Sequence, residues 1–291
     1  NFKAIFANQL DSIYSVTIGD GVTEIVANSF FQCHYLQFVT IANTVSIIQN
    51  SAFSRCSSLK TVTVPASVTS IGHYAFDCCP LESISILGDV TLGRMIFNQD
   101  ESLTTFKLLG NVYSFDLDFF GICTAITSVS LGSDSALNAF ISAYSSKTSV
   151  TSVILGDGVT TIGDRSFFQY SCLASINFPN TLKSIGVYAF YMTNLTSIDL
   201  PDSLESIGNY AFYSLGSLTS VNFGNSVNSI GESAFYGTRL TSITLPNTLH
   251  SVGGRAFYAC TSLTSVTFEG LRDAEHGNGV FTIAPFEHVN V

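Results

Sequence analysis

The stretch LTSIDLPDSLESIGNYAF (residues 195–212) recurs with few changes as LTSVNFGNSVNSIGESAF (218–235) and LTSITLPNTLHSVGGRAF (240–257). Each copy ends on a phenylalanine, and equivalent phenylalanines follow one another along the chain, mostly at intervals of 22 or 23 residues. They are Phe30, Phe53, Phe76, Phe97, Phe120, Phe140, Phe167, Phe190, Phe212, Phe235 and Phe257. A fixed period of this length, with apolar residues in fixed positions, predicts a solenoid whose coils bury their apolar faces only against each other.

A single repeat predicts the course of one coil. In residues 195–212 the pattern L-x-x-I-x-L predicts a short strand whose apolar side chains point into the coil. Pro201 ends this strand because proline has no N–H to donate, and Leu204 and Ile207 form a second apolar pair. A brief helical or irregular turn then brings Phe212 into the core. The strands of successive coils should align as a parallel sheet.

The composite pattern S-I-G-x-x-A-F-x-x-C-x-x-L-T-S-V-x-L-P resembles the BspA-like class of leucine-rich repeats, known from surface proteins of anaerobic bacteria and parasitic protozoa. The resemblance covers about residues 13–268. It implies a leucine-rich repeat solenoid of about 11–12 coils, with a parallel β-sheet on the concave face and short strands, turns and helical turns on the other side. The asparagine position of the general leucine-rich pattern holds Ser203 or Thr248, so no asparagine ladder is expected.

The repeat is irregular in the middle of the chain and ends before the C-terminus. Residues 132–149 read as a polar insertion or distorted coil, which is either drift or a loop that adds to a binding surface. After Phe268 no strand position follows in phase, so the remaining segment should cap the core. The expected organisation is the start of the array (1–12), the solenoid (13–268, irregular over 97–167) and a C-terminal cap (269–291).

Composition excludes several classes of partner. Only 11% of the residues are charged and the net charge is −10, so no basic patch for nucleic acid or for an anionic membrane is expected. No apolar stretch has the length of a membrane helix, so membrane insertion is not expected either. Because the chain starts at Asn1 and carries no signal peptide, we expect a mature product or an excised piece of a longer protein.

The seven cysteines are best interpreted by their place in the repeat. Five of them lie three residues after a repeat phenylalanine, in a slot that holds Thr193, Leu215 or Thr238 in other coils. A slot with these occupants predicts free, buried thiols, although an isolated disulfide involving Cys78 and a metal site remain alternatives. The five are Cys33, Cys56, Cys79, Cys123 and Cys260.

No catalytic or cofactor site is expected. The five histidines fall in different phases of the repeat and cannot form a column, and no nucleophile, phosphate-loop or zinc-protease motif is present. Polar residues collect near the C-terminus, where a solvated cap is expected in preference to a metal site. They are Asp273, Glu275, His276, Glu287 and His288.

The outward positions of the predicted sheet form the first candidate surface. They are nearly all serine, threonine or asparagine, which favours either simple β-propensity with solubility or a weakly polar recognition face. Five residues depart from this background: Lys60, Glu82, Lys107, Ile154 and Asp199.

Aromatic residues in the last five coils form the second candidate surface. One residue after the repeat phenylalanine the chain has Phe168, Tyr191, Tyr213, Tyr236 and Tyr258. Two residues before it come Arg165, Tyr188, Tyr210, Ser233 and Arg255. Since positions three apart on a helical turn share a face, these columns predict a tyrosine patch with an arginine at each end. The patch is either half-buried edge packing or a platform for sugar, protein or self-association.

The resemblance implies a secreted or cell-surface, non-enzymatic scaffold for binding or adhesion, with a host or extracellular-matrix protein or a glycan as partner. The physical pattern alone supports an extended binding scaffold. The alternative is a passive spacer that presents another domain. A binding module should carry a localised patch of unusual residues, and a spacer should carry none.

Overall fold

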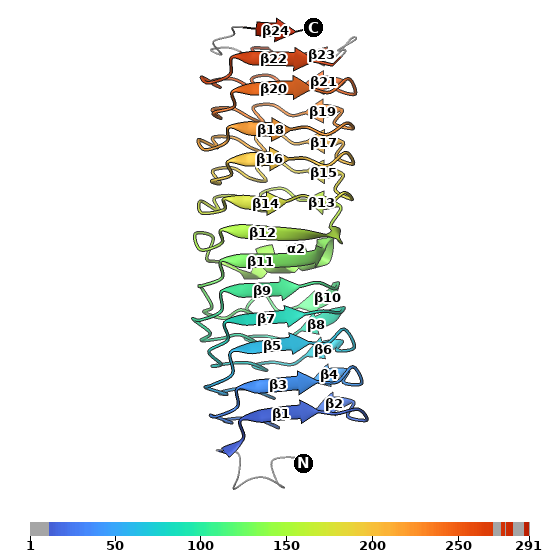
Figure 1. The fold of residues 1–291 in the computed structure, drawn as a ribbon, viewed down its shortest axis with the longest axis vertical. Helices are drawn as coiled ribbons and strands as arrows, with labels where there is room; N and C mark the ends of the chain where they lie inside the picture. Colours follow the sequence, from blue (N-terminus) through green and yellow to red (C-terminus); the bar gives the residue numbers. More distant parts are fainter. Residues whose placement is uncertain (1–11, 270–274, 277, 282–287, 291) are drawn as a thin grey trace. The chain divides into compact units, whose positions relative to one another are not determined.

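The computed structural model describes residues 12–269, 275–276, 278–281 and 288–290. The chain forms two compact units, the first unit (Asn1–Ser149) and the second unit (Val150–Val291). In each, a coil consists of a longer strand, a short second strand and a wide turn, and the strands of successive coils follow one another in chain order (Figure 1). This arrangement is the parallel solenoid that the period predicts, and it agrees with the leucine-rich repeat fold that the resemblance implies.

The first unit contains two parallel series of strands and a single described α-helix. The longer strands are β1 (Ser15–Ile18), β3 (Phe38–Ile41), β5 (Thr61–Val64), β7 (Ser83–Ile86), β9 (Thr105–Leu108) and β11 (Ser128–Ser133). The second series is β2 (Glu24–Ile25), β4 (Ile47–Ile48), β6 (Ser70–Ile71), β8 (Val90–Leu92) and β10 (Val112–Phe115), and the helix is α2 (Asp134–Ala143). Pairs such as β5 with β7 and β7 with β9 are parallel and in register.

The second unit repeats this plan. Its longer strands are β12 (Ser152–Gly158), β14 (Ser175–Asn177), β16 (Ser197–Asp199), β18 (Ser220–Asn222), β20 (Ser242–Leu245), β22 (Ser265–Phe268) and β24 (His288–Asn290). The second series is β13 (Thr161–Ile162), β15 (Ser184–Ile185), β17 (Ser206–Ile207), β19 (Ser229–Ile230), β21 (Ser251–Val252) and β23 (Glu275–His276), which pair in that order.

Exposed and buried side chains alternate along the strands, so one face of each strand lies in the core. In β5 the two threonines are exposed while Val62 and Val64 are buried, and β20 has the same pattern. Each two-residue strand of the second series with described side chains buries one aliphatic residue, such as Ile71 in β6. The sequence therefore encodes two inward-facing apolar rows per coil.

The repeat phenylalanine is delivered by a wide turn that is irregular, not helical. Two residues before and two after the phenylalanine, the backbone is left-handed, as at Tyr188 (φ 56°) and Met192 (φ 58°). The N–H groups of Tyr188, Phe190 and Met192 all donate to carbonyls of the next coil, at 2.8–3.3 Å. These bonds form a third ladder between coils, and they satisfy the backbone of a turn that side-chain sterics alone would disfavour.

The phenylalanine rings form stacks inside each unit. In the first unit Phe30, Phe53 and Phe76 are near parallel with centroids 5.0 and 5.3 Å apart. In the second unit the stack runs from Phe167 to Phe281, with successive centroids 5.1–5.4 Å apart. A ring from each coil thus packs on its neighbour, which explains why this position tolerates so little variation within the chain.

A hydroxyl ladder occupies the slot where other leucine-rich repeats carry asparagine. Ser203 Oγ donates to the carbonyl of Leu182 at 2.7 Å, and Thr248 Oγ1 donates to that of Val227 at 2.9 Å. Thr44, Ser67 and Thr181 make the same bond to the preceding coil. The expected absence of an asparagine ladder in this slot is confirmed, and a shorter side chain performs the same linking role.

Of the two interpretations of residues 132–149, the polar insertion is wrong and the distorted coil is confirmed. Helix α2 lies there, capped by Ser133, whose Oγ accepts from the N–H of Ala136 at 3.1 Å. Its inner side buries Ala136, Leu137, Ala139 and Phe140. Phe140 therefore reaches the core from a helix and meets Phe120 edge to face at 5.8 Å, outside the parallel stack. The irregular spacing arises because a helix replaces the wide turn in this coil.

The expectation that no strand position follows Phe268 is also wrong. Strand β23 pairs in parallel with β21, and β24 pairs with β22, so both series continue by one coil. Phe281 stacks on Phe257 at 5.4 Å in the slot of the repeat phenylalanine. The interval of 24 residues and the weak strand pattern concealed this last repeat in the sequence.

Candidate binding surfaces

A tyrosine face lies on the wide turns of the second unit. We define it as Phe168, Tyr188, Tyr191, Tyr210, Tyr213, Tyr236 and Tyr258, which follow β13, β15, β17, β19 and β21. All seven rings are partly buried. The two columns come together as predicted, but through left-handed turn residues and not through a helical turn.

The longer column of this face is a continuous ring stack. Phe168 and Tyr191 lie 5.0 Å apart, Tyr191 and Tyr213 5.5 Å, Tyr213 and Tyr236 4.6 Å, and Tyr236 and Tyr258 5.2 Å, all between centroids. Their interplanar angles are 9–19°. Each inner ring is therefore covered on both faces by its neighbours, and only its edge and hydroxyl are open to a ligand.

The shorter column is a pair of stacked rings, of which Tyr188 is covered on both faces. Tyr188 and Tyr210 stack at 4.7 Å with an interplanar angle of 7°, and the guanidinium of Arg165 lies 5.8 Å from the centre of the Tyr188 ring. Across the columns, Tyr188 meets Tyr191 edge to face at 5.6 Å. The expectation of a joined patch is thus matched by the geometry of the two columns.

The arginines lie at the two ends of the face, as the sequence predicts. Arg165 is 6.0 Å from the Phe168 ring and Arg255 is 5.9 Å from the Tyr258 ring. Both are exposed, and neither forms an ion pair with a carboxylate in the described part of the chain. Two cations without an ion pair among the described residues therefore flank an aromatic surface in an acidic protein.

A groove of about 420 Å³ opens between the two columns at the Arg165 end. Arg165 is the only charged residue in its lining. The hydroxyls of Tyr188 and Tyr191 make no hydrogen bond within the described residues, so they are available as donors or acceptors. The lining residues are Arg165, Phe168, Gln169, Tyr188, Tyr191, Tyr210 and Tyr213.

Two phenols of this face, those of Tyr210 and Tyr213, have a raised pKa. Partial burial raises the pKa of Tyr210, and the Glu232 carboxylate, which accepts from Tyr210 Oη at 3.2 Å, raises it further. The pKa of Tyr213 is raised by burial first and then by the neighbouring phenols of Tyr236 and Tyr191. Both groups therefore act as neutral hydrogen-bonding groups at physiological pH.

The first unit fills the same two slots with mostly polar residues. Ser54 Oγ and Asn98 Nδ2 both donate to the carboxylate of Asp77, at 3.3 and 2.9 Å. Tyr74 is an aromatic residue in the other slot, with Arg94 5.9 Å from its ring centre. Arg94 also lies 3.8 Å from Asp118, so this cation is paired.

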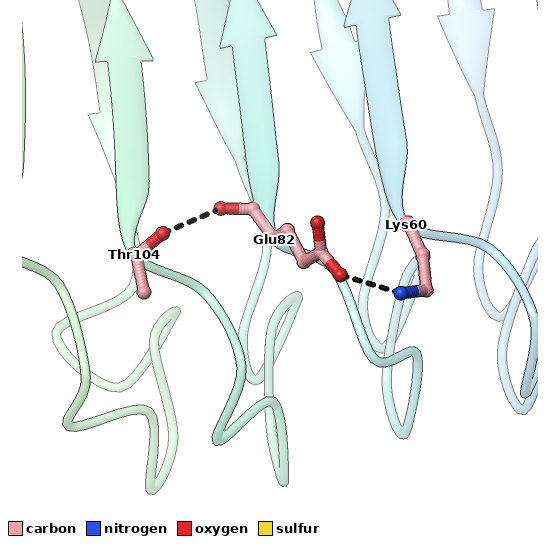
Figure 2. A network of polar contacts seen from close by, with 3 residues as sticks. All are labelled: Lys60, Glu82 and Thr104. Atoms are coloured by element: carbon pink, nitrogen blue, oxygen red, sulfur yellow. Dashed lines mark hydrogen bonds and ion pairs between the residues drawn. The ribbon is translucent and has the colours of Figure 1, made fainter.

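The charged residues predicted on the sheet side are not gathered into one site. Lys60 and Glu82, just before β5 and β7, form an ion pair at 2.6 Å, and Thr104 Oγ1 donates to the carbonyl of Glu82 at 3.2 Å (Figure 2). Their side chains are 63% and 55% exposed. Lys107 aligns with Ser85 and Ser130 in neighbouring strands and is exposed.

The remaining exceptions on the sheet side lie in the second unit. Ile154 is 53% exposed and aligns with Asn177, and Asp199 is exposed beside Asn222. A second ion pair, which the sequence analysis did not single out, joins Lys183 and Glu205 at 3.1 Å. Like the first, it links adjacent coils at the surface and contributes little to stability.

The cysteines are free, as predicted. Cys33, Cys56, Cys79, Cys123 and Cys260 are buried, while Cys78 is partly buried and Cys172 is exposed. The thiols of Cys56, Cys79 and Cys260 donate to the carbonyl of the repeat phenylalanine one coil earlier, at 3.0–3.2 Å.

One member of this thiol slot is an aspartate that the sequence analysis missed. Asp100 lies three residues after Phe97, is fully buried, and neither carboxylate oxygen has a hydrogen-bond partner. Burial raises its pKa to about 8, against a smaller lowering by the backbone N–H groups of Ser102 and Leu81, which lie outside hydrogen-bonding geometry. Its phase relative to Phe97 was the signal that could have revealed it.

In the residues that the structure describes, no group of three or more His, Cys, Asp or Glu side chains is placed to hold a metal ion. The side chains expected to collect in the C-terminal segment, those of Asp273, Glu275, His276, Glu287 and His288, lie outside the described ones. None of the described helices has the length and apolar character needed to cross a membrane.

Similar structures come from bacteria. A leucine-rich repeat protein from Bacteroides ovatus is 26% identical, with 92% of this chain and 75% of that chain covered and a TM-score of 0.40. The T. pallidum leucine rich repeat protein is 28% identical over 62% of this chain and 76% of that one (TM-score 0.45). A leucine rich cell surface protein from Faecalibacterium prausnitzii is 18% identical over 96% and 87% (TM-score 0.26). At these scores they carry no argument about function.

The repeat itself has a match at the level of the family. Among curated proteins none matches the chain. The sequence profile described as "BspA type Leucine rich repeat region" matches six times, over residues 3–127 and 138–264. These segments contain the stacked phenylalanines from Phe30 to Phe257 and most strands of both series. The chain therefore belongs to the BspA-type leucine-rich repeat family.

Proposed function

We propose that this chain is a non-enzymatic binding scaffold, secreted or displayed at the cell surface, that contacts a protein partner through its tyrosine face. The observation that carries the proposal is the contrast between equivalent turns. The second unit has a row of aromatic rings, four of them tyrosines, where the first has one aromatic residue, Phe31, followed by Ser54, Asp77, Asn98 and Gly121, although the backbone and its ladder are alike. A localised surface of this kind distinguishes a binding module from a passive spacer.

The chemistry of the face favours a protein over a glycan. A sugar ring that stacks on an aromatic side chain needs an open ring face, and the inner rings here cover one another at 4.6–5.5 Å. What remains is a row of phenol edges and hydroxyls, with an arginine at each end. Tyrosine and arginine are the residues that dominate protein–protein contacts, because they combine apolar area with directional hydrogen bonds. The extracellular location follows from the resemblance to surface proteins and is part of the proposal.

An array of immobilised matrix proteins and glycans would test this function. We expect the purified chain to bind a subset of the proteins, and the triple variant Tyr191→Ser, Tyr213→Ser, Tyr236→Ser to lose that binding. A second triple variant with phenylalanine at these positions keeps the ring stack and removes the hydroxyls, so it remains informative if the serine variant does not fold.

The matched control uses the same slot in the first unit. Ser54→Ala with Asn98→Ala should leave binding unchanged, because these residues lie outside the tyrosine face. Circular dichroism and melting curves report whether each variant is folded. Binding to no protein on the array, or binding that both tyrosine variants retain, would refute the proposed function.

A further inference from the structure

We propose that the groove at the Arg165 end of the tyrosine face is a subsite for a carboxylate side chain of an acidic segment in the partner protein. This inference rests on the proposed function and adds the chemistry that the partner must supply. Its elements, within the described part of the chain, are a guanidinium without an ion pair, two phenol hydroxyls without a hydrogen bond, and the rings of Tyr188 and Tyr191, whose two faces are covered.

Charge is the first argument. The chain carries 11 basic and 21 acidic residues, and in the described residues the Lys60, Lys183 and Arg94 side chains pair with carboxylates. Arg165, like Arg55, Lys107, Arg239 and Arg255, has no such partner among the described residues. The carboxylate next to it in sequence, Asp164, already accepts the N–H of Val187 at 2.7 Å. An exposed cation therefore lies at a groove that has no other charge, and a carboxylate from outside complements it.

Orientation is the second argument. The ring of Tyr188 covers one side of the Arg165 guanidinium at 5.8 Å, and Phe168 lies 6.0 Å from it. These two contacts restrict the freedom of a long side chain before any ligand arrives. A guanidinium held in this way presents its N–H groups in a fixed plane, which suits the two oxygens of a carboxylate.

The hydroxyls supply the third argument. Tyr188 and Tyr191 line the same groove, and their hydroxyls have no bond within the described residues. Tyr210 differs because its hydroxyl already donates to Glu232. Two tyrosines and one arginine with these properties therefore line a groove of about 420 Å³, which lies in the range of small-ligand sites.

The source of the carboxylate is a peptide and not an acidic glycan. Tyr188 has Arg165 on one face and Tyr210 on the other, and Tyr191 has Phe168 and Tyr213. Neither Tyr188 nor Tyr191 therefore offers a face to a uronic acid ring, whereas Tyr210, among the described residues, stacks on Tyr188 alone. A peptide needs no ring face, because an Asp or Glu side chain enters by its carboxylate and its neighbours rest on the tyrosine edges.

Arg255 provides the matched control. It occupies the same repeat slot, has the same left-handed backbone (φ 58° against 57° for Arg165) and also lies near a ring, that of Tyr258. It does not line the groove, since the residue before it in its column is Ser233, which is buried and carries no ring. If only the positive charge mattered, replacing either arginine would weaken binding of the carboxylate to the same extent. If the subsite matters, only the replacement of Arg165 weakens it.

The test compares three probes by isothermal titration calorimetry. They are a short peptide that alternates Glu and Leu, its Gln and Leu counterpart, and an oligosaccharide of glucuronic acid. We expect the Glu peptide to bind saturably and about tenfold or more tightly than the Gln peptide, with an affinity that falls as salt is added. Arg165→Gln should remove this preference, and Arg255→Gln should leave it intact.

Three outcomes overturn the inference. The first is equal affinity for the Glu and Gln peptides, which includes no binding of either at millimolar concentration. The second is that Arg165→Gln still prefers the Glu peptide. The third is that the glucuronate oligosaccharide binds more tightly than the Glu peptide. The protein that the array identifies as a partner distinguishes failure of the carboxylate subsite from failure of the proposed function. If tyrosine substitutions abolish partner binding while Arg165→Gln does not, the tyrosine face stands and the carboxylate subsite does not.

Discussion

The wide turns of the two units share one backbone and carry different surfaces. In both, left-handed residues flank the repeat phenylalanine, and N–H groups of the turn donate to the next coil. On this common frame the first unit carries the polar set Ser54, Asp77 and Asn98, while the second carries stacked tyrosines. The fold therefore tolerates either kind of residue in these slots, and the tyrosines are not a requirement of the coil. This difference is the reason to assign binding to the second unit.

The largest loss of stability should come from removing a stacked phenylalanine, and it should be the same in both units because their cores are built alike. Phe76→Ala and Phe212→Ala each remove a fully buried ring from a stack. Each should lower the free energy of unfolding by about 3–5 kcal/mol, since the lost ring leaves a cavity. Urea unfolding followed by circular dichroism measures this. A change below about 1 kcal/mol in one unit only would mean that the two cores are not equivalent.

The second largest effect should be a pH dependence of stability that comes from Asp100 in the first unit. Burial raises the pKa of Asp100 to about 8, so the folded chain retains a proton that the unfolded chain releases near pH 4. Stability should therefore be greatest below about pH 4 and should fall as the pH rises towards 8. Asp100→Cys restores the usual residue of this slot and should raise the free energy of unfolding at pH 7 by about 2–4 kcal/mol.

Urea unfolding at a series of pH values checks the Asp100 prediction. The variant should lose the part of the pH slope that the parent shows between about pH 4 and pH 8. Asp199→Asn is the control, because Asp199 is exposed and should not alter that slope. An unchanged slope in Asp100→Cys would contradict the account of a neutral, buried carboxyl group.

A smaller difference should separate the two outward surfaces. Tyr213 stacks on a ring on each side, so Tyr213→Ser should lower the free energy of unfolding by about 1–3 kcal/mol. Asn98→Ser, in the same slot of the first unit, loses one side-chain hydrogen bond and should cost about 1 kcal/mol or less. Melting temperatures of the two variants give the comparison. Equal losses would show that the ring stack adds nothing to the packing of the second unit.

The smallest effects should come from two Lys–Glu ion pairs, one chosen from each unit. The pairs Lys60–Glu82 and Lys183–Glu205 are each more than half exposed. Double-mutant cycles on urea unfolding should give coupling energies of about 0–1 kcal/mol for both, and added salt should reduce them. A much larger coupling in one pair would mark a structural difference between the units that the geometry does not predict.

The period of the sequence was sufficient to predict the coil, its two apolar rows and the slot of buried thiols, because each depends only on spacing. The period was not sufficient to assign Phe140 and Phe281, whose spacing does not reveal which structure they belong to. Phe140 resembles a repeat phenylalanine but belongs to α2, whose cap at Ser133 was the better signal. Phe281 belongs to the stack but follows a weak strand pattern.

The candidate site was predictable to a similar extent. The slots of Tyr188 and Tyr191 placed the two columns next to each other, and Arg165 at one end. Ring orientation was not predictable, because it depends on how neighbouring side chains pack between coils. The covered ring faces, which decide between a peptide and a sugar, became visible only in the structure.

The most direct test of the central claim is a chemical footprint of the tyrosines with the array partner bound. Mild nitration followed by peptide mass spectrometry reports which phenols the partner covers. We expect protection of Tyr191, Tyr213 and Tyr236, and none at Tyr35 and Tyr113 of the first unit, which are 49% and 68% exposed. Protection at Tyr35 or Tyr113, with unchanged nitration of the tyrosine face, would contradict the assignment of binding to the second unit.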